Sequence, residues 1–415
     1  MLTYRAVPLL LLVLAARLAQ AQPGQPPAAP LTLADVQALA ARGAPDLAAA
    51  EAAIAQARGE LMAARAYPGP FFEVGAARAR GDDGRGTESE VAIRQPLDLF
   101  GRLAARRDVA EAAVAAEESA RDQVALVLRG MVRIAFAEAL AAERALATAR
   151  EDLAAAAELE QLVSRRADLG EAREVDRLRF GIERHRAEAR VESLEVARQA
   201  GRRALDILAG GALPANAELA GEAAPPTVPP IGVALAAVER HARLRIADAL
   251  VRQREAELRL ALANRRPDVE IGVAREEELD KVANGVQVGI GIPLFGWNRG
   301  AIAAARAAVE RARAERAAIV RELSGEISTA HAELEAATKR LQRLESELLP
   351  RSRRGVEIAE LAFRHGETSL LDLLDVRRTH IALQQEQLDA LLEMAAAQAR
   401  LEQLTGGSTS DGMER

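Results

Sequence analysis

Residues 285–300, GVQVGIGIPLFGWNRG, decide how this chain folds. The first half of the stretch has an apolar side chain at every second position, alternating with glutamine and glycine. This period of two predicts a β-strand with one apolar face and one small or polar face. The apolar positions are Val286, Val288, Ile290 and Ile292. A proline then ends the strand, because it has no backbone N–H to donate. An aromatic pair and a long helical pattern follow, as expected where a chain leaves a membrane and enters water.

The same alternation occurs three more times along the chain. We expect strands at about residues 70–80, 88–97 and 267–277, and a fourth at about 284–294. Apolar residues at steps of three and four predict helices in the rest of the chain. These helices are expected at 33–66, 99–164, 171–208, 231–266, 298–349 and 370–404, with Pro350 ending the fifth. A helix of roughly 65 residues is a rod of about 100 Å.

The two halves of the chain repeat one pattern of helix, hairpin, helix and helix. Three landmarks recur at nearly equal separations of about 199, 197 and 196 residues, which indicates a duplication. The matched pairs are Pro68 with Pro267, Pro96 with Pro293 and Gly170 with Gly366. We therefore expect a signal peptide at 1–21, a Pro-rich segment at 22–32, a first repeat at 33–220, a Pro-rich linker at 221–230, a second repeat at 231–405 and a disordered tail at 406–415.

Composition narrows the class of protein. Hydrophobic residues make up 49% of the 415 residues but aromatic residues only 2%, which favours long helices packed through small side chains. The net charge of −6 is spread along the helices without a basic block, so nucleic acid is not an expected partner. The chain has no cysteine, which excludes disulfides, thiolate metal sites and a lipoprotein anchor. Its five histidines lack metal-ligand spacing and no catalytic motif stands in context, so we expect neither an enzyme nor a cofactor.

The N-terminus has the three parts of a secretory signal. Arg5 supplies a positive charge, residues 9–14 an apolar run, and Ala19-Gln20-Ala21 a cleavage site. A membrane anchor is the alternative, but the run is short for a span, so we expect cleavage after Ala21. No later helical run approaches the ~20 apolar residues of a membrane helix. Any crossing of a membrane is therefore expected to be made by strands.

The long helix of the second half has a coiled-coil seam. Its apolar positions are Ile319, Leu323, Ile327, Ala330, Leu334, Ala337, Leu341, Leu344 and Leu348. A soluble coiled coil would explain this seam but not the four alternating segments. In a membrane barrel, the apolar positions of those segments would face lipid and the alternate positions a wet lumen.

Six of the nine aromatic residues beyond the signal lie where helices meet strands. They are Tyr67, Phe71, Phe72, Phe100, Phe295 and Trp297. An aromatic girdle at a membrane interface would produce this clustering, whereas the simpler interpretation is that they fill the helix–sheet junction. Four strands cannot close a barrel, and open edges are not tolerated in lipid. Two copies would give eight strands and three copies twelve, and the residues alone do not choose between them.

Three segments carry a resemblance to a known family. They are QPLDLFGR at 95–102, IPLFGWNRG at 292–300 and FRHGETSLLDLLD at 363–375. The chain resembles the TolC-type outer-membrane efflux proteins over essentially its whole length, and its junctions and tip are most like those of the CzcC-like branch, which serves heavy-metal cation pumps. The resemblance implies a mainly α fold with a small β part. In it, a duplicated long-helix α-barrel carries four strands that join a trimeric transmembrane β-barrel. The implied partners are two further copies, a periplasmic adaptor, an inner-membrane pump of the RND type and outer-membrane lipid.

Two aspartates are candidates for a constriction at the periplasmic end. Asp372 and Asp375 are three residues apart, so they share one helix face, and they match the aspartates that line the entrance of TolC-like proteins. In a trimer, their carboxylates would form a cation-selective ring. The alternative is an ordinary helix N-terminus, where aspartate is favoured by the helix dipole. Asp176 takes the place of Asp372 in the first half, but Arg179 takes that of Asp375.

The predicted turns at the tips are the expected contacts for the adaptor. Gly170 and Gly366 let the chain reverse, and Arg364 and Asp176 lie beside them. Thr368 stands where some relatives have a basic gating residue, so a latch of that kind is not expected. The resemblance implies the outer-membrane channel of a tripartite efflux system, a passive exit duct for cations or small molecules. The alternatives are a duct for drugs or for polypeptides of type I secretion, and a periplasmic coiled coil without a pore.

Overall fold

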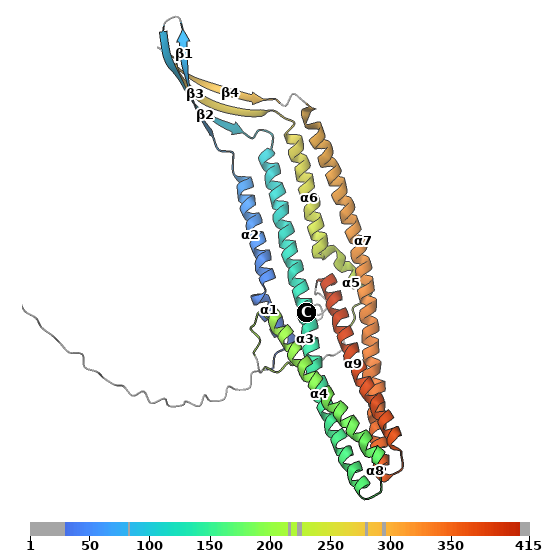
Figure 1. The fold of residues 1–415 in the computed structure, drawn as a ribbon. Coiled ribbons are helices and arrows are strands. Elements are labelled where there is room, and N and C mark those ends of the chain that lie inside the picture. The colour runs from blue at the N-terminus through green and yellow to red at the C-terminus, as the bar shows by residue number, and fades with distance from the viewer. Residues whose placement is uncertain are drawn as a thin grey trace, which may run out of the picture.

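The computed structural model describes residues 30–81, 84–214, 217–221, 226–278, 281–292 and 296–406. The predicted signal peptide lies outside these residues, as do most of the Pro-rich segment, Phe295 and all but the first residue of the predicted tail. The described chain is an elongated bundle of helices with a small antiparallel sheet at one end (Figure 1). At the other end are two tips, each a tight turn that connects one helix to the next. The predicted fold class, mainly α with four strands, is confirmed.

The sheet unites the two halves of the chain. It is an antiparallel meander in the order β1-β2-β3-β4. The strands are β1 (Phe71–Gly81), β2 (Gly84–Leu97), β3 (Asp268–Glu278) and β4 (Lys281–Gly291). Because β2 of the first half pairs with β3 of the second, the outer edges of the sheet are β1 and β4.

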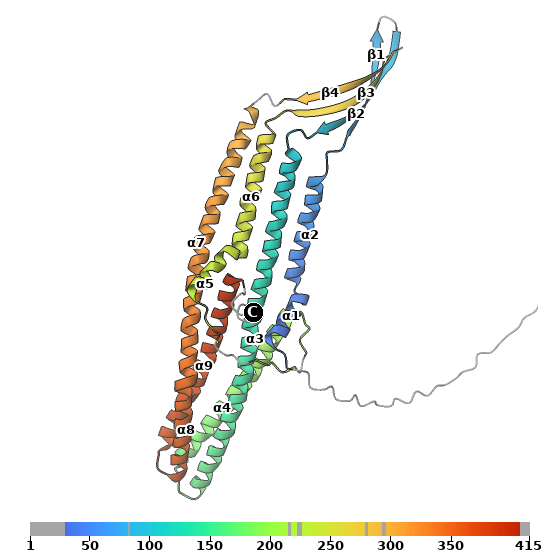
Figure 2. The same ribbon diagram turned by 180° about the vertical axis from the view of Figure 1, so that it is seen from behind.

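Four helices run side by side next to the sheet, as the two opposite views show (Figures 1 and 2). They pack in the order α2 (Pro45–Arg65), α3 (Arg102–Asp168), α6 (Ala242–Ala263) and α7 (Arg299–Arg343). A three-residue turn, η2 (Gly296–Asn298), precedes α7. In the half of the bundle farther from the sheet, α4 (Glu174–Leu208) packs on α3, and α9 (Leu370–Thr405) packs on α3, α7 and α8 (Leu349–His365). The edges of this half are therefore α4 and α8.

In the middle of the bundle, apolar side chains form one buried cluster within each half of the chain. The seam predicted on α7 is buried from Leu323 to Leu344 and packs against Leu391, Met394 and Leu401 of α9. A second cluster joins α1 (Leu33–Gly43) to α3 and α4. Together these clusters hold each long helix to neighbours that are distant in sequence.

The predicted helix at 231–266 is wrong in one respect, because it is broken at His241. The chain forms α5 (Ile231–Ala236) and a 3-10 turn, η1 (Ala237–Arg240), before α6 begins. His241 has extended backbone angles, and its Nδ1 accepts a hydrogen bond from Arg243 N–H at 3.1 Å, so it caps α6. Burial lowers the pKa of His241, which favours the neutral ring that this acceptor role requires.

Two prolines act differently from the prediction. Pro350 does not end its helix, because a π-turn, η3 (Leu344–Leu348), precedes it and the chain continues as α8. Proline has no N–H and its ring crowds the preceding turn, and the wider π-turn accommodates both effects. Conversely, the helix predicted at 33–66 is split at Ala44, and Pro45 is the first residue of α2.

Candidate functional site

One face of the sheet is apolar and exposed. Cross-strand pairing sets Phe72 opposite Ile93, Ile93 opposite Val273, and Val273 opposite Val286. The alternation predicted from single segments therefore becomes one continuous surface. Its exposed members are Phe72, Val74, Val91, Ile93, Ile271, Val273, Val286, Val288 and Ile290, with exposed fractions from 39% to 73%. A surface of this kind indicates contact with lipid or protein.

The opposite face of the sheet is small and polar. Gly272 stands opposite Gln287, and Gly289 opposite Glu270. Arg94 of β2 forms an ion pair with Glu73 of β1. The two faces differ in the way expected of a sheet with lipid on one side and water on the other.

Five of the six predicted girdle aromatics are described. Phe71 and Phe72 begin β1, and the other three lie in the segments that connect the strands to the helices. Tyr67, Phe71, Phe72 and Trp297 are exposed, and Phe100 is half-buried. The Tyr67 hydroxyl accepts a hydrogen bond from Asp98 N–H at 3.0 Å. Asp98 in turn caps α3, because its carboxylate accepts from the N–H groups of Arg102 and Leu103 at 2.9 and 2.8 Å. The junction is thus a hydrogen-bonded corner as well as an aromatic cluster.

Arg102 connects the two halves at this junction. Its guanidinium donates to the Arg266 carbonyl at 2.6 Å, just after α6 ends, and forms an ion pair with Asp268. These contacts span more than 160 residues of sequence. Sequence reasoning included Arg102 in a family motif but assigned it no role.

Each helical tip contains a glycine in the left-handed region. Gly170 follows α3 and Gly366 follows α8, both with φ of 76°. A Cβ is strained at this φ, so glycine allows the chain to reverse here.

Replacing Gly366 by alanine should destabilise the tip by about 1–2 kcal/mol, because an L-residue is strained at positive φ. Gly325→Ala is the matched control. Gly325 lies within α7, and a Cβ there would meet no atom within 4 Å, so the control should gain about 0.5–1 kcal/mol. Thermal unfolding and the rate of proteolysis at the tip measure both changes. Equal effects of the same sign would show that the turn does not depend on glycine.

Asp372 and Asp375 both lie exposed in the first turns of α9. Ser369 caps this helix in a reciprocal capping box, in which Asp372 N–H donates to the Ser369 hydroxyl at 3.2 Å and the hydroxyl donates to the Asp372 carboxylate at 2.6 Å. Hydrogen bonds from the side chain and backbone of Ser369 lower the pKa of Asp372. Within the described chain, the Asp375 carboxylate has no hydrogen-bond or ion-pair partner. The described chain therefore has the capped start of an ordinary helix N-terminus. It also has the two carboxylates without a cationic partner that a cation-selective constriction requires.

The corresponding turn of the first half is electrically different. Asp176 also occupies the third position of its helix, but the preceding Arg173 holds its carboxylate, with Nε at 2.9 Å from Oδ2. Arg179 replaces the second carboxylate. Uncompensated negative charge is therefore concentrated on the second tip.

Two contacts that the sequence did not predict join the tips. Arg166, near the end of α3, donates to the Phe363 and Arg364 carbonyls at 3.4 and 2.6 Å and so caps α8. Phe180 of α4 lies 5.8 Å from Phe363 between ring centroids. The partners are more than 180 residues apart in sequence, so no local pattern indicates these contacts.

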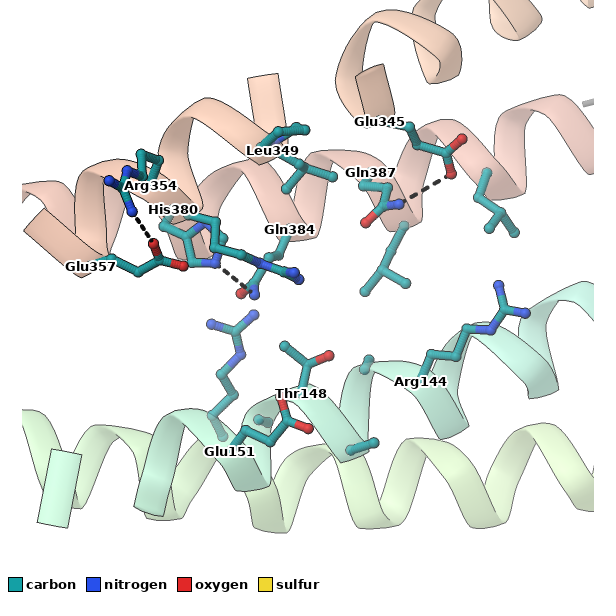
Figure 3. A pocket seen from close by; sticks show the side chains of 18 residues that line it. Arg144, Thr148, Glu151, Glu345, Leu349, Arg354, Glu357, His380, Gln384 and Gln387 are labelled. Atoms are coloured by element: carbon teal, nitrogen blue, oxygen red, sulfur yellow. Dashed lines mark hydrogen bonds and ion pairs between the residues drawn. The ribbon is translucent and has the colours of Figure 1, made fainter. Parts of the chain in front are cut away.

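A cleft separates α3 of the first half from the π-turn, α8 and α9 of the second (Figure 3). Its volume is about 780 Å³. Arg144 and Arg354 face it together with Glu151, Glu345 and Glu357, so it offers no field of a single sign. Among the described residues, no group of three or more histidines and acids could hold a metal ion. No helix in the described part of the chain is long and apolar enough to cross a membrane.

Comparison with known proteins agrees with this geometry. The family model for outer membrane efflux protein matches residues 36–211 and 234–407. The cobalt-zinc-cadmium resistance protein CzcC of Cupriavidus metallidurans is 27% identical over 385 residues, which is 91% of each chain. Two solved structures share the fold at about 90% coverage. They are the channel CusC, with a TM-score of 0.78 and 17% identity, and a membrane protein from Pseudomonas aeruginosa, with 0.77 and 21%.

An exposed apolar sheet on a long helical body, with two joined tips at the far end, defines a channel-forming class of outer-membrane protein. The chain belongs to the outer membrane efflux protein family. The predicted resemblance to TolC-type and CzcC-like proteins is confirmed, and the chain is an outer-membrane efflux channel component.

Proposed function

We propose that this chain forms the passive exit duct of a tripartite efflux system. Three copies form the duct, a periplasmic adaptor binds its tips, and an inner-membrane pump of the RND type supplies the energy. The mature chain begins after Ala21. The cargo is a metal cation, with small molecules as the broader class.

The two open edges of the sheet are the observation that supports this proposal. β1 and β4 are unpaired edges within one copy, and unpaired backbone groups are not tolerated in lipid. If β1 of one copy pairs with β4 of the next, the sheet closes on itself and its apolar face turns toward lipid. Three copies, as the family resemblance implies, would contribute twelve strands.

The helices repeat the same asymmetry. α4, at the first-half edge of the bundle, exposes Val175, Leu178 and Ile182 on one face. α8, at the other edge, exposes Ile358 and Leu361. Exposed apolar side chains at both edges support side-by-side packing of α4 on a neighbouring α8.

The second tip supports a cation as cargo. Two carboxylates from each of three copies, Asp372 and Asp375, would form a negative constriction that favours cations. The relative named for cobalt, zinc and cadmium resistance points the same way. Arg364, Gly366, Gly170 and Asp176 lie on the outermost turns, where an adaptor would meet the duct.

Asp372→Asn/Asp375→Asn should keep the pore and reduce its preference for cations. A unit charge at 4 Å in water is worth ~1 kcal/mol, so the preference for cations should fall by roughly fivefold or more. Conductance and reversal potential in planar bilayers measure the change, and zinc tolerance of cells that carry each version measures its effect on export. Asp168→Asn, at the first tip, is the control, because Arg177 lies 3.8 Å from that carboxylate.

The other outcomes separate the alternatives. Unchanged selectivity would keep the duct and move the constriction elsewhere. If cells with an impaired channel lost drug tolerance or polypeptide secretion but kept metal tolerance, the cargo would be a drug or a polypeptide and not a metal cation. Absence of conductance in a wild-type protein that stays soluble without detergent would leave the periplasmic coiled coil.

A further inference from the structure

Three exposed arginines lie where the sheet meets the helices, and the proposed duct gives them no role. We call Arg265, Arg266 and Arg299 the junction arginines. In the described part of the chain, no carboxylate lies within ion-pair distance of any of them. The nearby Asp268 is already paired with Arg102. The junction arginines are therefore uncompensated cations at one level of the molecule.

Aromatic rings hold two of these cations in place. The Cζ atom of Arg265 lies 5.9 Å from the centre of the Trp297 ring, and that of Arg266 lies 5.4 Å from the centre of the Phe100 ring. A guanidinium held over a ring by a cation–π contact keeps N–H donors in its own plane. Those donors match the oxygens of a phosphate group.

The backbone at Trp297 is strained in a way that fixes the first of these contacts. Trp297 and Asn298 have φ of 47° and 56°, although neither is glycine. The Asn298 amide donates to the Ala261 carbonyl of α6 at 2.9 Å and ties the turn to that helix. Strain of this kind persists where the surrounding structure enforces it, and it marks positions of functional interest.

The position of the junction arginines suggests their ligand. The apolar face of the sheet begins directly beyond them, and Leu262, near the end of α6 and three residues before Arg265, is 40% exposed. In a membrane, the phosphate layer lies where apolar protein surface ends and polar surface begins. Arginine at that level is attracted to anionic lipid.

We propose that the junction arginines bind the phosphate groups of anionic phospholipids in the leaflet next to the helical body. The proposal rests on the proposed function, because it requires the sheet to lie in a bilayer. Net-neutral phosphatidylcholine should bind less well than phosphatidylglycerol. An arginine near a charged surface contributes enough to enrich anionic lipid roughly fivefold.

The test measures which lipids remain on the purified channel. Full-length protein is reconstituted in vesicles of equal parts phosphatidylcholine and phosphatidylglycerol, extracted in mild detergent, and its bound lipids are counted by native mass spectrometry. Wild type should retain mostly phosphatidylglycerol. Arg265→Gln/Arg266→Gln should lower the ratio of anionic to neutral lipid by roughly fivefold or more. Arg265→Lys/Arg266→Lys should restore most of it, since the charge returns.

A matched control removes the same number of positive charges, but from the helical body and not from the junction. Arg351→Gln/Arg353→Gln removes two exposed arginines of α8 and should leave the wild-type ratio unchanged. Two results, each with both proteins still conducting, would overturn lipid binding by the junction arginines but keep the duct. One is a wild type without preference for phosphatidylglycerol, and the other is an Arg265→Gln/Arg266→Gln variant that keeps the wild-type preference. If the double variant does not conduct, the single variants Arg265→Gln and Arg266→Gln decide the question. If the wild-type protein neither floats with vesicles in a density gradient nor conducts ions, both the duct and the binding of lipid by the junction arginines would be overturned.

Discussion

Arginine in place of Val288 is expected to prevent most of the protein from folding into a membrane. Val288 is at the centre of the apolar face on β4, is 63% exposed in one copy and lies opposite Ile271. Arginine at the middle of a lipid-facing strand destabilises a membrane barrel by about 2–4 kcal/mol. The change occurs once in every copy, so a trimer carries it three times. The yield of heat-resistant oligomer in the outer-membrane fraction, and folding into vesicles under urea, measure the loss.

Gln287→Arg provides the matched control on the neighbouring residue. Gln287 lies on the opposite face of β4, opposite Gly272, where the proposed lumen is wet. The same arginine there should change stability by less than about 1 kcal/mol. If Val288→Arg behaves like Gln287→Arg, the apolar face is not in lipid. In a soluble coiled coil, by contrast, arginine at a position this exposed would be harmless or would improve solubility.

Much of the architecture could be predicted because its signals are local. Alternation at Val286, Val288 and Ile290 requires only that neighbouring side chains point to opposite faces. The seam on α7 follows from helix periodicity, and burial from Leu323 to Leu344 agrees with it. The recurrence of prolines and glycines in the two halves predicted where each half has its hairpin and its tip.

The errors arose where a local signal has more than one structural solution. Pro350 predicted a helix end, but a π-turn before it lets the helix continue. The break at His241 has the opposite cause. Residues 237–243, around the break, contain none of the usual N-cap residues, and a buried histidine caps the helix instead. Neither outcome can be read from propensity, because both depend on tertiary packing.

The candidate site was predictable only in part for a related reason. Asp372 and Asp375 were identified from a motif and from their spacing on one helix face. The contacts that position their helix, α9, join residues almost 200 positions apart, such as Arg378 of α9 with Glu183 of α4. A periodic pattern describes one element and its faces, and it does not identify which distant element packs there.

Phe180→Ala should have the largest effect at the tips. Phe180 is 1% exposed and belongs to a cluster with residues of α3 and α9, which are Leu159, Val163, Leu370, Leu373 and Leu374. Removing a buried phenylalanine side chain destabilises a protein by about 3–5 kcal/mol, through lost burial and the cavity left behind. Because this cluster joins the tip of the first half to that of the second, the loss should separate the tips before it unfolds the rest of the bundle.

Proteolysis measures this local opening. A change of 3–5 kcal/mol raises the open population by roughly two to four powers of ten, and cleavage between α8 and α9 should accelerate in proportion. Phe180→Leu is the graded control, since it keeps most of the volume and loses mainly the ring contact with Phe363, worth about 0.5–1.5 kcal/mol. Wild-type cleavage rates in Phe180→Ala would show that the cluster does not hold the tips together. Faster cleavage with leakier conductance, and with Asp372 and Asp375 unchanged, would show that the carboxylates select ions only while this packing keeps their helix in place.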